Sequence, residues 1–238
     1  DVAFKDEWWR EWEVRPYTMN VYIMVDPASS KKKESNRTAM CVVGVDANYN
    51  KFLLDGVCHR LSLSERWDFL KKLRSKWKRA PGVREVKVGY ERYGAQSDIE
   101  HFQEMMRIEG SNFPIYELNW VGGGGSQSKK DRIQRLEPDL KDGSFFWPYP
   151  TDKKMLTSLQ MELVDRKQEF LISKKIMCKD ENDRLYDLTK WVKDNEYNLF
   201  PTIHPDFLDA LSRIYDIDAT PPIIRSYRQL EPEAEAAY

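Results

Sequence analysis

Four acidic residues stand where predicted strands and the last predicted helix would bring them together. Asp26 follows one β-rich run, Glu91 follows a later one, and Pro205 opens a helix whose first turn contains Asp206 and Asp209. Crowded carboxylates repel each other unless cations neutralise them, and carboxylate oxygens suit Mg²⁺ and Mn²⁺. Two such ions about 3.5–4 Å apart can hold the attacking and leaving oxygens of a phosphodiester. The set therefore predicts metal-dependent phosphodiester hydrolysis.

Each of these acids also has a purely structural explanation. An Asp-Pro pair after a strand is typical of a turn, and a turn by itself is sufficient to explain Asp26. The negative charge of Asp206, in the first turn of its helix, interacts favourably with the helix dipole. Asp209 fits a surface position, and Glu91 can pair with a neighbouring arginine. The combination in this order is more specific than any member. We therefore expect all four to be catalytic and metal-binding.

The histidines offer one auxiliary candidate. His204 stands two residues before Asp206 and is either a capping or loop residue or a participant in metal binding or proton transfer. His59 and His101 fall on a predicted strand and a predicted helix without a matching partner, and we expect both to be structural.

Basic residues near the acidic set are expected to contact DNA. A mobile lysine close to a metal site can follow a phosphate backbone, whereas the basic face of the helix predicted at 62–79 is typical of a solvated surface. The expected DNA-binding residues are Lys31, Lys32, Lys33, Lys129, Lys130 and Arg132.

Composition restricts the class of protein. The 238 residues carry 38 Lys and Arg against 39 Asp and Glu, so the chain is not a globally basic nucleic-acid binder, and phosphate must be bound by a local patch. The three cysteines form no C-x-x-C pair, which supports neither a disulfide framework nor a zinc finger. No run approaches the roughly 18 apolar residues of a membrane span, and we expect no membrane partner.

The predicted elements give a fold class. Three strands with short connections precede alternating helices and strands, which predicts a mixed sheet covered by helices. This outline is α/β and matches a ribonuclease H-like sheet flanked by helices. The strands are expected at 21–25, 39–45, 51–61, 86–90 and 114–118, and the helices at 62–79 and 97–110. The capping-box spacing of Ser62 with Glu65 and of Ser97 with Glu100 predicts where these two helices begin.

Three parts of the chain are expected. Residues 1–18 form a connecting helix, because Phe4, Trp8 and Trp12 recur at helical spacing. Residues 19–218 form the nuclease domain, with an additional hairpin around 180–183 and a helix near 188–197. Residues 219–238 form a flexible tail. A glycine-serine loop at 122–128 is not a phosphate loop, since no Gly-Lys-Ser/Thr follows it.

Four short sequences resemble one known family. Tyr22-Ile23-Met24-Val25-Asp26-Pro27-Ala28 resembles the opening nuclease strand of the large terminase subunit of tailed bacteriophages, and Tyr90-Glu91-Arg92-Tyr93-Gly94 fits its second acidic position. Lys130-Asp131-Arg132-Ile133 is similar to its K-x-R-I sequence, and His204-Pro205-Asp206-Phe207-Leu208-Asp209-Ala210-Leu211 is similar to H-D-D-x-x-D-A-L. Pro205 departs from this pattern, where the family often has Asp, which leaves open whether Asp206 or Asp209 is the main third ligand. Because Asp206 follows His204 as in the family sequence, the resemblance favours Asp206.

The resemblance implies a ribonuclease H-like nuclease, related to resolvases, that uses Mg²⁺ or Mn²⁺, with two ions expected, to cut concatemeric double-stranded viral DNA during packaging. It also implies an upstream packaging ATPase domain, a small terminase subunit and a portal as partners, in the cytoplasm of the infected bacterial host. Two alternatives remain: a non-catalytic module that docks on DNA or on the portal, and a resolvase- or transposase-type nuclease of the same fold.

Overall fold

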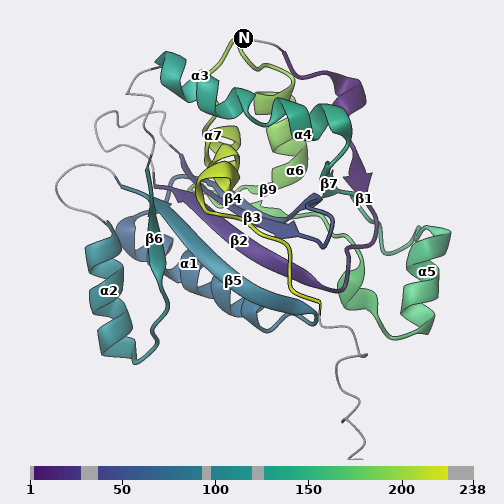
Figure 1. Cartoon of the computed structure of the whole chain (residues 1–238), viewed down its shortest axis with the longest axis horizontal. Coiled ribbons are helices and arrows are strands. Elements are labelled where there is room, and N and C mark those ends of the chain that lie inside the picture. Colours follow the sequence, from purple (N-terminus) through teal and green to yellow (C-terminus); the bar gives the residue numbers. More distant parts are fainter. Residues whose placement is uncertain (1–2, 28–36, 93–97, 120–125, 225–238) are drawn as a thin grey trace, which may run out of the picture.

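The architecture centres on one mixed β-sheet (Figure 1). The computed structural model describes residues 3–27, 37–92, 98–119 and 126–224. Within them the sheet has the strand order β1-β7-β4-β3-β2-β5-β6. Its strands are β1 (Glu11–Trp12), β2 (Met19–Asp26), β3 (Thr38–Val45), β4 (Lys51–His59), β5 (Val83–Glu91), β6 (Ile115–Leu118) and β7 (Phe145–Pro148).

Strand direction identifies the fold. β2, β3 and β4 form an antiparallel meander, and β5 returns beside β2 in the parallel direction, followed by β6. Every residue of β2 and β3 is buried, as expected for central strands covered on both faces. This order and these directions are those of a ribonuclease H-like fold, which confirms the fold class predicted from the sequence.

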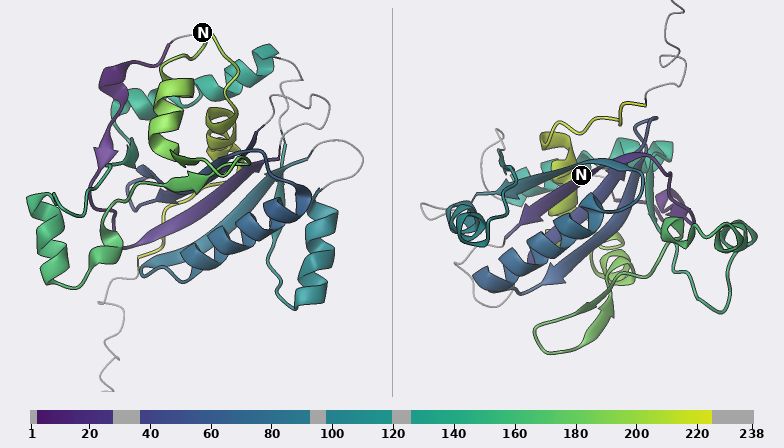
Figure 2. Two further views of the ribbon diagram at one scale, coloured as in Figure 1. Left: turned by 180° about the vertical axis from the view of Figure 1, so that it is seen from behind. Right: turned by 90° about the horizontal axis from the view of Figure 1, so that it is seen from below.

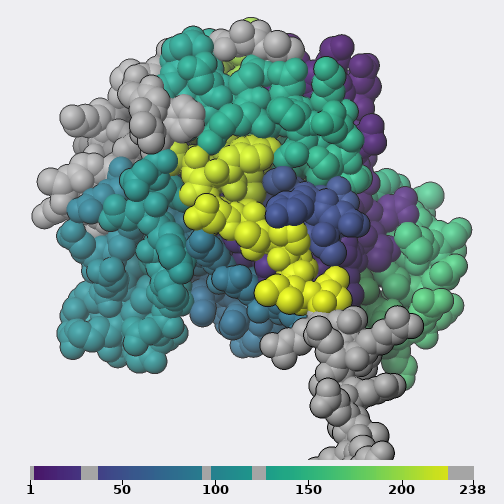
Figure 3. Space-filling model, in the orientation of Figure 1, coloured from purple at the N-terminus to yellow at the C-terminus, as the bar shows by residue number. Residues whose placement is uncertain are grey.

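Helices cover both faces of this sheet. α1 (Leu63–Lys78) connects β4 to β5 and α2 (Asp98–Glu109) connects β5 to β6; both lie on one side in the two views of Figure 2. The opposite side carries α3 (Ser126–Gln134), α4 (Glu137–Asp142), α6 (Leu188–Val192) and α7 (Asp206–Ser212). In Figure 3 the last described segment, in yellow, lies at the surface next to α3 and α4.

The start of α1 confirms a local prediction. The Ser62 side chain accepts from the Glu65 backbone N–H, and the Glu65 carboxylate accepts from the Ser62 N–H, which completes a capping box. Trp67, Leu70 and Trp77 form part of its buried stripe. Ser97, expected to open the next helix, lies outside the described residues.

The prediction of a connecting helix in residues 1–18 is wrong for the described part of this segment, residues 3–18. The segment instead forms a 3₁₀ turn, η1 (Asp6–Trp8), and the strand β1, which pairs in parallel with β7. The Trp12 indole N–H donates to the Leu53 carbonyl at 2.9 Å, and Trp9 stacks on Trp147 with ring centroids 4.0 Å apart. Tertiary burial of the aromatic rings overrides the helical spacing of their sequence.

The region after β7 contains the smaller elements. The predicted hairpin is confirmed as β8 (Met177–Lys179) paired with β9 (Leu185–Asp187), and the predicted helix is α6 followed by a π-helical turn, η3 (Lys193–Tyr197). The remaining elements are α5 (Ser158–Asp165), η2 (Glu169–Leu171) and η4 (Arg213–Asp216). Most of the expected tail, 225–238, lies outside the described residues. None of the helices in the described ranges has the length and apolarity needed to cross a bilayer.

Candidate metal centre

The register of two parallel strands brings the first two acids together. Val25 of β2 lies opposite Tyr90 of β5, so Asp26 and Glu91 are the next residues on neighbouring strands, at the end of both. Asp26 is buried and Glu91 is half-buried. The two carboxylates therefore lie side by side at the ends of two central strands, as strand order alone predicts.

The third acid comes from α7, whose start is held from outside the helix. Pro205, at the N-cap position, offers no side-chain acceptor. The buried carboxylate of Glu196 accepts instead from the backbone N–H groups of Asp206, Phe207 and Leu208, at 2.9–3.0 Å. These bonds satisfy donors that a helix start leaves unpaired and fix where α7 begins.

Burial makes Glu196 a weaker acid. It raises the pKa of this carboxyl to about 7, although the hydrogen bonds from Phe207 and Leu208 favour the charged form; the charge of Asp206 adds to the increase. α7 lies over β3 and β2, where the Cys41 thiol donates to the Phe207 carbonyl at 3.6 Å.

Three carboxylates converge at the sheet edge. Asp26, Glu91 and Asp209 each offer one oxygen, and these oxygens all lie within 4.8 Å of one another. Oxygens bound to one Mg²⁺ lie at most about 4.2 Å apart, because each is about 2.1 Å from the ion. A small contraction of the three side chains would therefore place them on one hard cation, and oxygen-only ligation is what Mg²⁺ and Mn²⁺ prefer.

Asp206, the acid that the resemblance favours as the main third ligand, does not lie with the other three acids. Among the described residues, the group of acids that could share a metal contains Asp209 and not Asp206. The Asp206 carboxylate instead accepts from the Lys129 ammonium at 3.0 Å and has a longer contact, 3.5 Å, with the Arg37 backbone N–H. Asp206 thus lies beside the triad of Asp26, Glu91 and Asp209, bound to a cation of the protein itself.

Two cations from α3 face the acids of α7. Arg132 donates from Nε to Asp209 Oδ1 at 3.0 Å and from Nη2 to Asp209 Oδ2 at 2.8 Å. Lys129 Nζ lies 3.6 Å from Asp209 Oδ2 in addition to its bond with Asp206. Burial lowers the pKa of the Lys129 ammonium, but the surrounding carboxylates outweigh burial and leave this pKa above its ordinary value. Both side chains therefore point at the acids.

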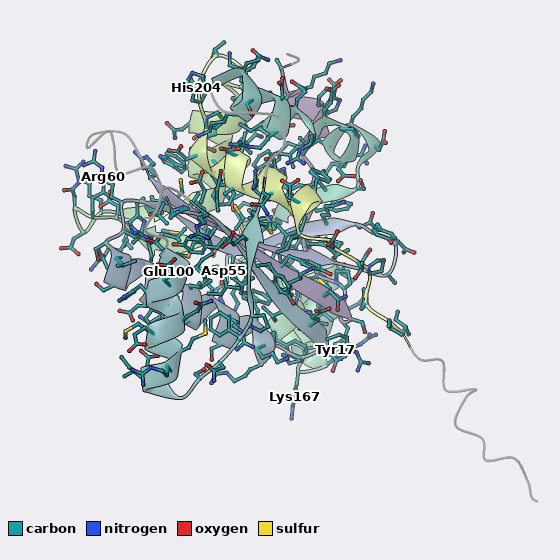
Figure 4. All side chains as sticks on the ribbon, turned by 60° about the vertical axis from the view of Figure 1, so that its left-hand side comes forward. Tyr17, Asp55, Arg60, Glu100, Lys167 and His204 are labelled. Atoms are coloured by element: carbon teal, nitrogen blue, oxygen red, sulfur yellow. The ribbon has the colours of Figure 1, made fainter. Side chains whose placement is uncertain are left out.

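The other predicted residues are spread more widely. His204 is exposed in the loop before α7, at the periphery of the molecule in Figure 4. His59 is buried and hydrogen-bonds the Tyr186 hydroxyl at 2.8 Å. Lys130 is half-buried, next to Lys129 on α3. Lys31, Lys32 and Lys33 lie outside the described residues.

Sequence reasoning overlooked Glu196 and treated Lys129 and Arg132 only as DNA contacts. One signal was present: Lys129 and Arg132 are three residues apart, as are Asp206 and Asp209, so each pair shares one helix face. Matching spacing of opposite charges on two predicted helices indicates a packed, paired interface. Nothing comparable marks Glu196, whose partners are backbone groups ten to twelve residues later.

The chain is similar to known proteins in structure and not in sequence. No protein-family model matches the chain, and no curated protein is significantly similar to it. Solved structures similar to it include the Mn-soaked human cytomegalovirus terminase nuclease domain, with 15% identity over 90% of this chain and 94% of that chain and a TM-score of 0.47. The fowlpox virus Holliday junction resolvase has 13% identity over 64% and 93%, with a TM-score of 0.33. The HK97 bacteriophage large terminase has 13% identity over 89% and 41%, with a TM-score of 0.34. The fold assignment rests on strand order and direction.

Proposed function

We propose that this chain is a divalent-metal-dependent nuclease that hydrolyses phosphodiester bonds in double-stranded DNA. The observation that supports it best is the convergence of Asp26, Glu91 and Asp209 at the central edge of a ribonuclease H-like sheet. Three carboxylates at this separation, two of them buried, are costly unless a cation joins them. A purely structural role does not require all three at one point.

The protein groups have separate tasks in this proposal. Asp26, Glu91 and Asp209 hold the metal, which when bound polarises the phosphodiester and lowers the pKa of water. Arg132 fixes the orientation of the Asp209 carboxylate through two hydrogen bonds. The central strands fix the other two acids: Asp26 ends β2, which is buried along its whole length, and Glu91 ends β5, which pairs with β2 up to the preceding residue. The acids are thus held by rigid elements before substrate arrives.

The biological substrate proposed is concatemeric viral DNA that is cut during genome packaging. This part rests on the four sequence stretches that resemble large terminase subunits, and with it come an upstream ATPase domain, a small subunit and a portal as proposed partners. The same acids would also serve a resolvase-type nuclease, and a docking module would use the surface without the acids.

Plasmid cleavage tests the proposal. Wild-type chain should nick or linearise supercoiled plasmid with Mg²⁺ or Mn²⁺ and be inactive in EDTA, and Asp209→Asn should remove cleavage. The matched control is Asp183→Asn, because Asp183 is 90% exposed in the β8–β9 turn and its positive φ of 60° suits Asn.

The outcomes separate the three candidates. Cleavage of unbranched duplex at a rate similar to that of a four-way junction supports the terminase-type nuclease, whereas cleavage restricted to the junction supports a resolvase. DNA binding without cleavage under either metal supports the docking module. Full cleavage in EDTA, or by Asp209→Asn, contradicts the metal centre.

A further inference from the structure

The acidic site of this chain contains a cation of its own. Lys129 Nζ lies 3.0 Å from Asp206 Oδ1 and 3.6 Å from Asp209 Oδ2, so the ammonium bridges the two acids of α7. Its side chain is only 20% exposed, and that of Asp209 is 1% exposed. α3 and α7 lie side by side in Figures 1 and 2, and their contact holds this arrangement.

The charges of the site show what the ammonium does. Within the part of the chain that the structure describes, the site has four negative charges, from Asp26, Glu91, Asp206 and Asp209, and two positive charges, from Lys129 and Arg132. The remainder is two negative charges, which one divalent cation neutralises. Glu196 also faces this region, but both of its oxygens accept hydrogen bonds from backbone N–H groups at the start of α7. The positive end of the helix dipole offsets its negative charge there.

The positions of the four acids agree with this charge count, because three of them form one group and the fourth is bound to Lys129. Asp26, Glu91 and Asp209 form the group whose oxygens lie within 4.8 Å, while Asp206 is engaged by Lys129. A second divalent cation bridging Asp206 and Asp209 would lie next to the Lys129 ammonium, which already contacts one oxygen of each acid. At about 4 Å, two positive charges repel strongly in a partly buried site, so ammonium and ion would compete there.

We propose that Lys129 is a built-in counter-ion that limits the DNA-free site to one divalent cation, held by Asp26, Glu91 and Asp209. This inference rests on the proposed metal-dependent function and adds the stoichiometry of the site. It assigns Lys129 a role that differs from the expected phosphate contact. A second ion could then enter only when Lys129 leaves Asp206, for which the phosphates of a substrate offer an alternative anionic partner.

Mn²⁺ binding without DNA tests the inference independently of catalysis. Electron paramagnetic resonance of free Mn²⁺ during titration gives the number of bound ions and their dissociation constants. The wild type should bind one Mn²⁺ per chain. Lys129→Met, which keeps side-chain length and removes the charge, should bind two, the second tightened by about tenfold or more relative to wild type. Lys130→Met on the same helix and the charge-retaining Lys129→Arg should stay at one.

Each outcome bears on the proposal. Two ions of similar affinity on the wild type would overturn it, and so would one ion on a folded Lys129→Met. Thermal melting checks folding; if Lys129→Met does not fold, Lys129→Gln is titrated in its place, and the wild-type stoichiometry is decisive by itself. Failure of the nuclease proposal gives a different pattern, namely absent plasmid cleavage with Mn²⁺ stoichiometry still measurable.

Discussion

Arg132 and Asp209 form a two-bond ion pair across the interface between α3 and α7, with N···O distances of 3.0 and 2.8 Å. The Asp209 side chain is 1% exposed and the Arg132 side chain 10% exposed. Both oxygens of Asp209 are engaged, so this carboxylate cannot rotate away from the end of β2 without breaking a buried pair. The pair therefore stabilises the packing of two helices and orients a proposed metal ligand.

This pair predicts strong coupling between the two residues. Arg132→Met alone should lower the free energy of unfolding by about 3–5 kcal/mol, because it leaves the Asp209 charge buried without its main partner. Asp209→Asn alone should also destabilise the metal-free protein. Urea unfolding in EDTA of the two single variants and the double variant measures the coupling, and the double variant should lose much less than the sum of the singles. Additive losses would contradict the pair.

Asp26 should behave differently when metal is added. At a Mn²⁺ concentration one hundred times the dissociation constant, ligation of the native state should stabilise the wild type by about 2.7 kcal/mol. Asp26→Asn removes one ligand charge from the triad, so most of this stabilisation should disappear. Thermal melting with and without Mn²⁺ measures it, with Asp183→Asn as the exposed control. An unchanged Mn²⁺ response in Asp26→Asn would place the metal elsewhere.

Glu196 predicts a pH dependence of stability. Its pKa is about 7 in the folded chain against an ordinary value of 4.5. Between these values the folded chain keeps a proton that the unfolded chain has released, so the contribution of Glu196 to stability falls as the pH rises from 4.5 to 7. The change is on the order of 3 kcal/mol over this window. Glu196→Gln should remove it.

Urea unfolding at pH 5, 6, 7 and 8 in EDTA measures this effect. The stability of the wild type relative to Glu196→Gln should be greatest at pH 5 and decrease toward pH 7, then level off. The exposed Glu162→Gln is the control and should give a curve parallel to that of the wild type. A constant difference between wild type and Glu196→Gln at all four pH values would show that the Glu196 carboxyl titrates normally.

The N-terminal segment should be required for stability. Trp12→Ala should cost about 3–5 kcal/mol, because it empties a buried aromatic site. Trp12→Phe should cost about 1–3 kcal/mol, mainly by depriving the Leu53 carbonyl of its indole donor. Denaturant unfolding gives both values, and Tyr49→Phe, at a residue that is 57% exposed, should have little effect. Wild-type stability in Trp12→Ala would restore the view of this segment as a separate connection.

The sequence alone determined the elements that repeat a local pattern. The capping box of Ser62 and Glu65 predicted where α1 begins, and the apolar run before Asp26 predicted the central strand. The order of strands and helices then predicted the sheet, because short antiparallel links and helical crossovers allow few arrangements. That order was also sufficient to place Asp26 beside Glu91, since both end neighbouring parallel strands.

Tertiary structure alone decided which acid of α7 joins them. Asp206 and Asp209 are three residues apart on one helix face, so sequence spacing treats them alike. The first N–H groups of α7 donate to Glu196, which fixes the position of this helix on the sheet. In that position Asp209 lies close to Asp26. The packing of α3 then brings Lys129 to Asp206. Helix docking depends on long-range packing: the matched spacing of charges indicates that the two helices pair, but it does not tell which acid then faces Asp26 and Glu91.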